Sequence, residues 1–571
     1  MKGPPDGQAA NGDFCLVLHG HLPWVLHHGY WPHGEVWLYE AAAETYLPLL
    51  DVIERGAAEG FATPMTLGLT PVLLEQLRAP AFAVGFVRFL ERQLARTEAD
   101  AREFSQRGDL HLAWLAAFWG RHFRALLDRF EALGRDIVGA YARLDRAGRI
   151  ELLTSNATHG YMPLLLHDAC GRAQVRAGVA TSRRHLGFSP RGAWLPECAY
   201  RPADLWHPPV VHGYPRQRAG VEELFAQEGV QYFFVDAHLL AGARSEGVVG
   251  EHGFVKVGWD QAAWDTRRGW RSVLEPHGVS SHGGPPRLTV LARHPEVSEQ
   301  VWSGEVGYPG DGRYLEFHKR HGQDGLHYWK VTGPRTDLGD KHPYHPQDVA
   351  AAIDEHAGHF CSVVHALLDR HRSSTGRHGV VVAPFDAELF GHWWHEGPRF
   401  LEAVFRRLAK DPGVTPTTAS THLRLHPPDK VVRLPEGSWG EGGDHRVWFN
   451  EELRWVWEAA YRAEDRFIGL LHDVDWRGNP AVREALTAAG RELLLLQASD
   501  WAFVIHTRGA VDYGYRRLCE HLAGFDRACT IAEARGRGEP DDELRRHELR
   551  DLALHDDCFP DLQLEWWADG A

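Results

Sequence analysis

Cysteine and methionine are scarce in this chain, with seven and three among 571 residues. The cysteines are far apart, contain no Cys-x-x-Cys pair and are odd in number, which argues against a disulfide framework and predicts small buried thiols in a reducing cytoplasm. No stretch reaches the roughly 18 consecutive apolar residues that a transmembrane helix needs. The polar start of the chain, Met1 to Asp13, lacks the parts of a signal peptide. We therefore expect a soluble cytoplasmic protein without a membrane anchor.

The chain has too few basic residues to bind a strongly negative partner such as nucleic acid. Lysine and arginine number 62 against 77 aspartate and glutamate residues, which gives a formal net charge of −15. A protein that binds nucleic acid must offer the phosphate groups a basic surface. The charge balance therefore predicts no nucleic-acid partner.

Tryptophan and histidine, in contrast, are abundant, with 22 and 37 residues. A buried tryptophan needs a partner for its N–H group, so a surplus beyond core filling indicates flat surfaces on which a ligand stacks. Sugars have apolar C–H faces that suit such rings. The surplus therefore favours a sugar ligand.

Short apolar or β-branched runs separated by helical stretches predict parallel strands that are buried on both faces. Seven such runs indicate a closed or nearly closed (β/α) barrel. They lie at residues 14–18, 65–69, 151–154, 192–195, 231–235, 288–291 and 379–383.

Helical periodicity follows the second of these runs and dominates the C-terminal part of the chain. The chain of 571 residues is also longer than a usual single core. We predict an α/β protein with three parts. A discontinuous catalytic barrel spans 14–75 and 148–420, an inserted helical domain spans 76–147, and a C-terminal all-helical domain spans 421–571.

Polar or titratable residues follow six of the seven predicted strands. In such barrels the loops after the carboxyl ends of the strands converge on one face, where catalytic groups collect. The residues that these loops would bring together are His19 and His21, Asn156 and His159, Glu197, Asp236 and His238, Arg293, and Asp386.

Two of these residues, Glu197 and Asp386, are suited to be the acid pair of a sugar-cleaving site. Retaining glycoside cleavage needs one carboxylate as nucleophile and a second carboxyl group as proton donor, about 5–5.5 Å apart. Glu388 lies two residues after Asp386 and would share its face in an extended segment, so either could be the second acid. Glu197 could instead be a solvated loop residue or a negative charge at the start of a helix.

His19 and His21 would share a face in an extended segment, as a pair of metal ligands could. No clear third ligand motif accompanies them, and Asp236 and His238 are the only further candidates nearby. In a sugar site the same histidines donate hydrogen bonds to hydroxyl groups. We therefore predict no metal and no cofactor, with a metal-dependent polysaccharide deacetylase as the competing hypothesis from a different class.

Five segments resemble, in order, the five sequence regions of glycoside hydrolase family 57. They are 19–23 (HGHLP), 155–161 (SNATHGY), 194–198 (WLPEC), 385–394 (FDAELFGHWW) and 437–445 (GSWGEGGDH). The last region, together with 497–501 (QASDW), looks most like the branching-enzyme branch of that family. The resemblance spans almost the whole chain from Phe14 onward, and five ordered motifs are far more specific than any one of them.

The resemblance implies a (β/α)7 barrel with an inserted helical domain and a C-terminal helical domain, in agreement with the strand pattern. It also implies that Glu197 is the nucleophile, Asp386 the general acid/base and Glu388 a supporting residue. Any one of the aromatic rings could instead fill the core. The substrate-binding residues that we expect from the motifs and strand ends are His19, His21, Trp31, His159, Arg293, Trp302, Tyr308, Trp394, Trp439, Trp448 and Asp500.

The activity implied by the resemblance is 1,4-alpha-glucan branching by a retaining double displacement. An α-1,4 glucan would be cut and its chain transferred to a 6-hydroxyl group, which forms an α-1,6 branch. Amylose, amylopectin or glycogen would serve as donor and acceptor, and we expect a monomer. By the same resemblance, Tyr308 would lie at the tip of a mobile lid over 302–311 that helps to exclude water.

Other activities use the same features. Within the family, a 4-alpha-glucanotransferase or an alpha-amylase-type hydrolase would employ the same two acids. A non-catalytic glucan-binding protein would need only the aromatic rings.

Overall fold

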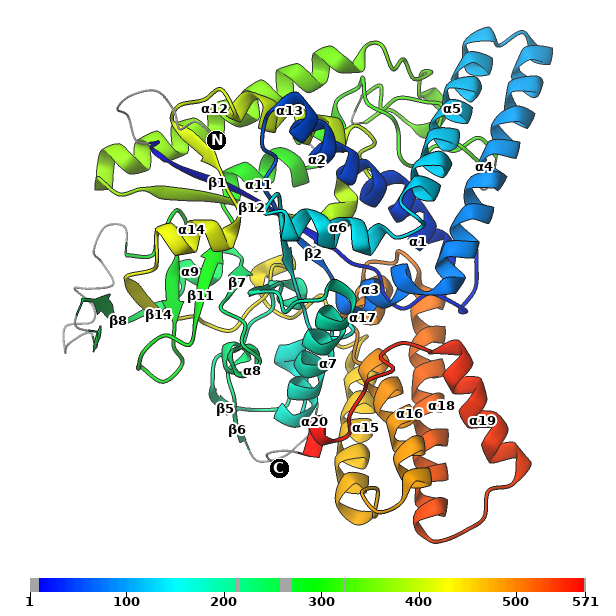
Figure 1. The fold of residues 1–571 in the computed structure, drawn as a ribbon, viewed down its shortest axis with the longest axis vertical. Coiled ribbons are helices and arrows are strands. Elements are labelled where there is room, and N and C mark those ends of the chain that lie inside the picture. Colours follow the sequence, from blue (N-terminus) through cyan, green and yellow to red (C-terminus); the bar gives the residue numbers. More distant parts are fainter. Residues whose placement is uncertain are drawn as a thin grey trace.

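The computed structural model describes residues 10–210, 215–251, 253–256, 270–304, 306–322, 325–333 and 335–568. These residues form an α/β fold with two large sheets, helices around them and a set of C-terminal helices (Figure 1). None of the helices in these ranges is long and apolar enough to cross a membrane. Glu305 of the predicted lid lies outside the described residues.

The first sheet is parallel, with strand order β12–β1–β2–β3 and with β13 beside the start of β1. Every residue of β1 is buried, as expected for a strand that is covered on both faces. The register of β1 and β12 places His19 beside Asp386 at the carboxyl end of the sheet. The strands are β1 (Gly12–Gly20), β2 (Met65–Leu69), β3 (Glu151–Leu153), β12 (Gly379–Asp386) and β13 (Val414–Pro416).

The second sheet has the order β4–β7–β11–β10–β14–β8–β9. It is parallel from β4 to β11 and mixed beyond. Its strands, in chain order, are β4 (Gly192–Ala193), β7 (Tyr232–Val235), β8 (Arg244–Gly250), β9 (Gly253–Lys256), β10 (His277–Val279), β11 (Leu288–Ala292) and β14 (Lys430–Arg433). A separate hairpin is formed by β5 (Asp204–Trp206) and β6 (Arg216–Arg218).

All seven predicted runs form strands, namely β1, β2, β3, β4, β7, β11 and β12. The strand β14 was not predicted, since it follows residue 421, where we expected only helices. This strand has four residues and buries only Val431 and Val432, so its sequence is too short to show a strand period.

Backbone contacts join the edges of the two sheets. Thr154, directly after β3, forms an isolated parallel bridge with Ala193 of β4. The backbone N–H of His294, after β11, donates to the carbonyl oxygen of Val382 in β12 at 3.0 Å. Strand pairing thus defines two sheets and does not by itself close the predicted barrel. Side chains from both sheets also join one buried cluster, which includes Cys15, Val17, Leu153, Trp194, Tyr232, Phe234, Leu291, Val380 and Val382.

Helices connect the strands and form two further groups. In Figure 1, α4 and α5 form a long hairpin at the upper right, within the predicted insertion, and the C-terminal helices lie at the lower right. The helices before β14 are α1 (Glu35–Ala41), α2 (Leu47–Glu59), α3 (Pro71–Arg78), α4 (Pro80–Arg107), α5 (Leu110–Ala132), α6 (Ile137–Arg146), α7 (Asp168–Leu186), α8 (Val221–Gln227), α9 (Ala237–Ala241), α11 (Pro295–Trp302), α12 (Val349–Thr375), α13 (Gly397–Leu408) and α14 (Ala419–Leu425). Those after it are α15 (Arg454–Asp473), α16 (Pro480–Leu496), α17 (Ser499–His506), α18 (Val511–Gly536), α19 (Glu543–His555) and α20 (Glu565–Ala568).

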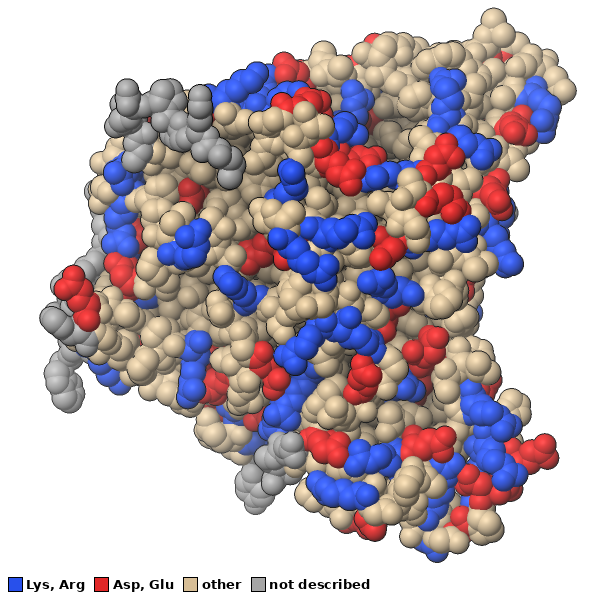
Figure 2. All heavy atoms as spheres, in the orientation of Figure 1, with Lys and Arg blue, Asp and Glu red and all other residues tan. Residues whose placement is uncertain are grey.

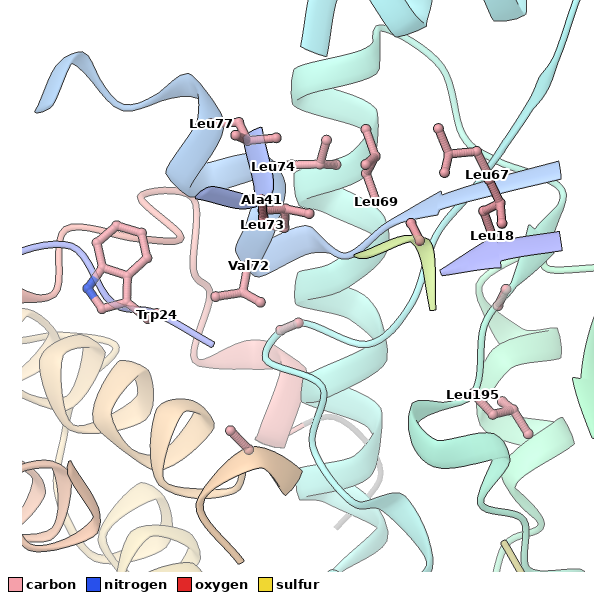
Figure 3. Close-up of a cluster of buried hydrophobic side chains, with 14 of the residues drawn as sticks. Leu18, Trp24, Ala41, Leu67, Leu69, Val72, Leu73, Leu74, Leu77 and Leu195 are labelled. Atoms are coloured by element: carbon pink, nitrogen blue, oxygen red, sulfur yellow. The ribbon is translucent and has the colours of Figure 1, made fainter. Parts of the chain in front are cut away.

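An apolar cluster anchors the carboxyl ends of β1 and β2. Leu18 of β1 lies beside Leu67 of β2, and Leu69 of β2 lies between them and the leucines of α3 (Figure 3). Because Leu18 is buried completely, its neighbour His19 is held at a fixed position on the sheet edge.

Candidate active site

A cleft of about 770 Å³ opens at the carboxyl ends of β1 and β12. Both predicted acids, Glu197 and Asp386, line it. The predicted substrate-binding residues that line the same cleft are His19, His21, His159, Arg293, Trp302, Trp439, Trp448 and Asp500.

Glu197 is held in a strained turn. It lies in a three-residue 3₁₀ turn (Pro196–Cys198), with φ of 60° at Glu197 and 48° at Cys198. The left-handed region costs a non-glycine residue about 1 kcal/mol or more, so surrounding contacts must hold it. The backbone N–H of Trp439 donates to the carbonyl oxygen of Glu197 at 3.0 Å, and its indole Nε1 donates to Oε2 at 2.9 Å.

A chain of hydrogen bonds leads from β1 to the other oxygen of Glu197. The hydroxyl of Ser499, the first residue of α17, donates to Oε1 at 3.1 Å. Ser499 Oγ therefore accepts from Nδ1–H of His159 at 2.8 Å. This leaves Nε2 of neutral His159 to accept from Nε2–H of His19 at 3.0 Å. The remaining Nδ1 of His19 is buried and has no hydrogen-bond partner among the described residues, as expected for an unprotonated nitrogen.

The two linked histidines are neutral. Burial, and then the charge of His21, holds the pKa of His159 well below its usual value. The same two causes act on the pKa of His19. The His19 ring also stacks on Trp194, with 4.7 Å between ring centroids. These rings are therefore fixed hydrogen-bonding groups at the floor of the cleft rather than charges.

His21 has the opposite character. Burial would lower its pKa, but the carboxylates of Asp500, Glu388 and Glu197 outweigh burial and raise it. Its Nε2 lies 3.0 Å from Asp500 Oδ1, and its Nδ1 lies 2.9 Å from Thr70 Oγ1.

One group of side chains in the cleft could hold a metal ion by proximity. Ligand atoms of His21, His159 and Asp500 lie within 4.8 Å of one another. All four ring nitrogens of the two histidines already have hydrogen-bond partners, including Thr70 and Ser499. The predicted pair of His19 and His21 does not form this group.

The two carboxyl groups that compete for the second acid have different environments. Glu388 Oε1 accepts from the Tyr46 hydroxyl and, at 3.0 Å, from the backbone N–H of His21. The Asp386 carboxyl group makes no hydrogen bond or ion pair among the described residues. Burial, and then the charges of Glu388 and Glu197, raises the pKa of Asp386 well above its usual value, while Arg293 opposes this shift.

The pKa of Glu197 is also raised, to about 7. Burial is the largest cause, and the negative charge of Asp500 adds to it. The hydrogen bonds from Trp439 and Ser499 stabilise the ionised form and limit the rise. The site can therefore hold a protonated Asp386 and ionise Glu197 near neutral pH.

Three predicted residues lie outside the cleft lining. Trp31 is 43% exposed and lines a separate hollow with Tyr513. Tyr308 is buried, with its hydroxyl 2.7 Å from His359 Nδ1, so in this structure it does not form the tip of a lid over the cleft. Trp394 is buried against Phe400, with 4.9 Å between ring centroids, and acts as a core side chain.

Asp236 and His238 also take another role. Asp236 forms an ion pair with Arg293, and His238 Nδ1 lies 3.5 Å from Asp236 Oδ1. The pair therefore positions Arg293 at the cleft edge.

Several cleft residues were missed from the sequence. Trp37 of α1, Trp393 and Phe503 of α17 add aromatic surface to the lining. Trp393 stands inside the fourth family motif, and Ser499 precedes Asp500 in the 497–501 motif, so both could have been found there. Trp37 has no such signal, because a helix shows the same pattern whether its ring faces a ligand or a core.

Comparisons with known proteins identify the family of this chain. The family model for glycosyl hydrolase family 57 matches residues 15–435, and the model for the C-terminal region of 1,4-alpha-glucan branching enzymes matches residues 459–567. A 1,4-alpha-glucan branching enzyme of Thermococcus kodakarensis is 39% identical over 519 residues, which cover 90% of this chain and 73% of that relative.

Two solved structures have the same fold. The GH57-type branching enzyme from Pyrococcus horikoshii has 36% identity and a TM-score of 0.88, with 98% of this chain and 97% of that chain covered. The alpha-amylase AmyC from Thermotoga maritima has 28% identity and a TM-score of 0.81, with 98% and 99% covered.

Proposed function

The chain belongs to glycosyl hydrolase family 57 and is a 1,4-alpha-glucan branching enzyme of that family, and from this premise we propose how its cleft carries out the transfer. Asp386, protonated, donates to the glycosidic oxygen while Glu197 attacks the anomeric carbon and forms a glycosyl-enzyme. Asp386 then takes the proton from the 6-hydroxyl group of a glucan acceptor, which displaces Glu197 and creates an α-1,6 branch.

The observation that carries this division of roles is the contrast between the two carboxyl groups. Both oxygens of Glu197 are fixed, by Trp439 and Ser499, in a turn that holds a nucleophile in one orientation. Asp386 has no such partners among the described residues, so its proton is free to move to the substrate. Glu388, with Oε1 engaged by Tyr46 and His21, supports the site instead.

We assign sugar binding to the other lining residues. His19, His159 and Arg293 line the floor, and the indole rings of Trp302 and Trp439 offer apolar faces for glucose units. Trp448, only 1% exposed, stacks on Tyr161 behind them. Ser499 and Asp500 come from α17, so the C-terminal helical region completes the site.

We also propose that seven strands form a (β/α)7 barrel. The bridge from Thr154 to Ala193 and the hydrogen bond from His294 to Val382 would join the two sheets at both edges. The buried cluster drawn from β1, β3, β7, β11 and β12, together with Trp194 directly after β4, would then fill the interior.

Product analysis on amylose tests the proposed activity. We expect wild-type enzyme to create α-1,6 linkages, counted after enzymatic debranching, with few new reducing ends. An amylase would instead release reducing ends without new branches. A glucanotransferase would change chain lengths without new branches and without new reducing ends.

Variants test the assigned residues in the same assay. Glu197→Gln and Asp386→Asn should each lower branching by roughly 10⁴-fold or more, because each removes a group that acts on the reacting atoms. Glu484→Gln is the matched control, since that side chain is 67% exposed and remote from the lining. Comparable activity of Glu197→Gln and the control would overturn the assignment.

A further inference from the structure

Three histidines and an aspartate meet at the amino-terminal ends of β1 and β12, opposite the cleft. Asp13 is the second residue of β1, His378 directly precedes β12, and His422 and His426 belong to α14 and its C-terminal end. One ligand atom from each lies within 4.8 Å of those of the other three. Six strand residues separate Asp13 from the cleft end of β1, about 20 Å. The branching reaction therefore makes no use of this cluster.

The spacing on α14 suits a shared ion. His422 and His426 are four residues apart, and the backbone N–H of His426 donates to the His422 carbonyl at 2.7 Å, so both belong to the same helical turn. Residues at this spacing lie on one helix face, where two histidines can chelate one metal ion. His378 stacks on His426, with 4.0 Å between ring centroids.

Among the described residues, two buried nitrogens of the cluster lack a well-aligned hydrogen-bond partner. His422 Nδ1 lies 2.7 Å from Asp13 Oδ2, which leaves Nε2 of that ring buried and unpaired. His378 Nε2 lies 3.0 Å from Asp13 Oδ1, but off the line that a hydrogen bond requires. Unpaired buried polar atoms are rare because each costs free energy, and a bound cation would satisfy them.

The cluster is also accessible to an ion. A hollow of about 230 Å³, lined in part by His378 and His426, lies beside it. The one arginine in that lining, Arg377, is paired with Glu275 at 3.0 Å and with Asp429 at 2.9 Å. The entrance therefore carries no uncompensated positive charge from this side chain.

We propose that Asp13, His378, His422 and His426 bind one divalent transition-metal ion of the zinc class, which ties α14 to the starts of β1 and β12. Three imidazoles and a carboxylate match the ligand preference of zinc and its neighbours, whereas magnesium and calcium prefer oxygen ligands. With metal–nitrogen distances of about 2.1 Å, tetrahedral ligands lie roughly 3.4 Å apart. The four ligand atoms, now within 4.8 Å of one another, would move closer together on binding the ion.

Zinc binding by the full chain tests the proposal. Protein stripped with EDTA is titrated with zinc sulfate in competition with a chromophoric chelator. His378→Gln and His426→Gln are suitable variants, because both side chains are only partly buried. We expect each variant to bind one zinc ion fewer than wild type. Because the readout is this difference, any zinc bound in the cleft of both proteins cancels. His282→Gln, with a side chain 59% exposed and outside the cluster, should keep the wild-type stoichiometry.

Thermal unfolding supplies the second readout. Zinc should raise the unfolding midpoint of wild type and of His282→Gln by about 2 °C or more, and should leave both cluster variants unchanged. Retained branching activity shows that the variants are folded. Equal zinc stoichiometry in wild type and the cluster variants would overturn the proposal. The proposal would also fail if the cluster variants unfold below wild type by the same amount with zinc as without it. In that case the four residues would form only a hydrogen-bonded network.

Discussion

Among single residues, Glu197 is the proposed nucleophile, and in the proposed mechanism its surroundings set the pH at which the enzyme works. Burial dominates and raises its pKa to about 7, and the other contacts adjust this value in both directions. Attack requires the ionised carboxylate, so activity should rise as the pH rises through this pKa. It should fall again when Asp386, whose pKa is raised by burial and by Glu388, loses its proton.

Trp439→Phe should move the acidic limb of the kcat/KM profile to higher pH, by about one unit. The indole N–H donates to Glu197 Oε2, and its loss disfavours the ionised form. The kcat/KM values are measured with amylose over the whole pH range in which the enzyme stays folded. Trp393→Phe, which also lines the cleft, is the control and should leave the limb in place. An unmoved limb in Trp439→Phe would contradict the account.

Asp500→Asn should move the same limb to lower pH. Removing this negative charge favours ionisation of Glu197, since Asp500 raises the pKa of that carboxyl group. The same kcat/KM profile measures the change. A shift in the same direction as that of Trp439→Phe would show that the electrostatics of the cleft are misassigned.

At the scale of elements, the strands that were predictable are those buried on both faces. Runs such as residues 65–69 are wholly apolar apart from a threonine and a glycine, and β2 has the same bounds. The short strand β14 has no such run. It forms by pairing with β8 and β10, which are distant in sequence, and a four-residue strand held by distant partners shows no local pattern.

The same limit explains which site residues could be found. Polar residues at strand ends, such as His19 and Asp386, could be found because the strands before them were predictable. A tryptophan motif cannot separate a stacking ring from a packing ring, and Trp394 proved to pack in the core whereas its neighbour Trp393 lines the cleft. The left-handed turn at Glu197 likewise depends on Trp439, 242 residues away.

Gly178→Ala tests the contact that places His159. A Cβ atom at Gly178 of α7 would lie 2.3 Å from the carbonyl oxygen of Ser155 and 2.9 Å from the carbonyl carbon of Asn156. The substitution should therefore destabilise the fold by about 1–3 kcal/mol and lower activity, as the loop before His159 shifts. Chemical denaturation and the branching assay measure the two effects.

Gly469→Ala is its matched control on α15. A Cβ atom there meets nothing within 4 Å, so alanine should stabilise the helix by about 0.5–1 kcal/mol. Equal stability of Gly178→Ala and Gly469→Ala would refute the close approach.

At the scale of the whole molecule, the site is assembled from distant parts. β12 and the 3₁₀ turn that holds Glu197 supply the two proposed reacting groups, β1 supplies His19, and α17 from the C-terminal helices supplies Ser499 and Asp500. On the face seen in Figure 2, acidic and basic side chains are interspersed, without a continuous field of either sign. Such a surface suits a neutral polysaccharide.

Salt should accordingly have little effect on substrate binding. Glucans carry no charge, so screening removes no attraction between enzyme and substrate. We expect the KM for amylose to be the same at low and high salt. A KM that rises steeply with salt would point to a charged substrate instead.

The most direct test of the central claim is to trap the covalent intermediate. Enzyme is incubated with a slowly hydrolysed fluorinated glycosyl fluoride, digested and mapped by mass spectrometry. We expect one glycosyl adduct on the peptide that contains Glu197, and none in Glu197→Gln. An adduct on Asp386 or Glu388, or turnover of the donor by wild-type enzyme without any adduct, would contradict the assignment of Glu197 as the nucleophile.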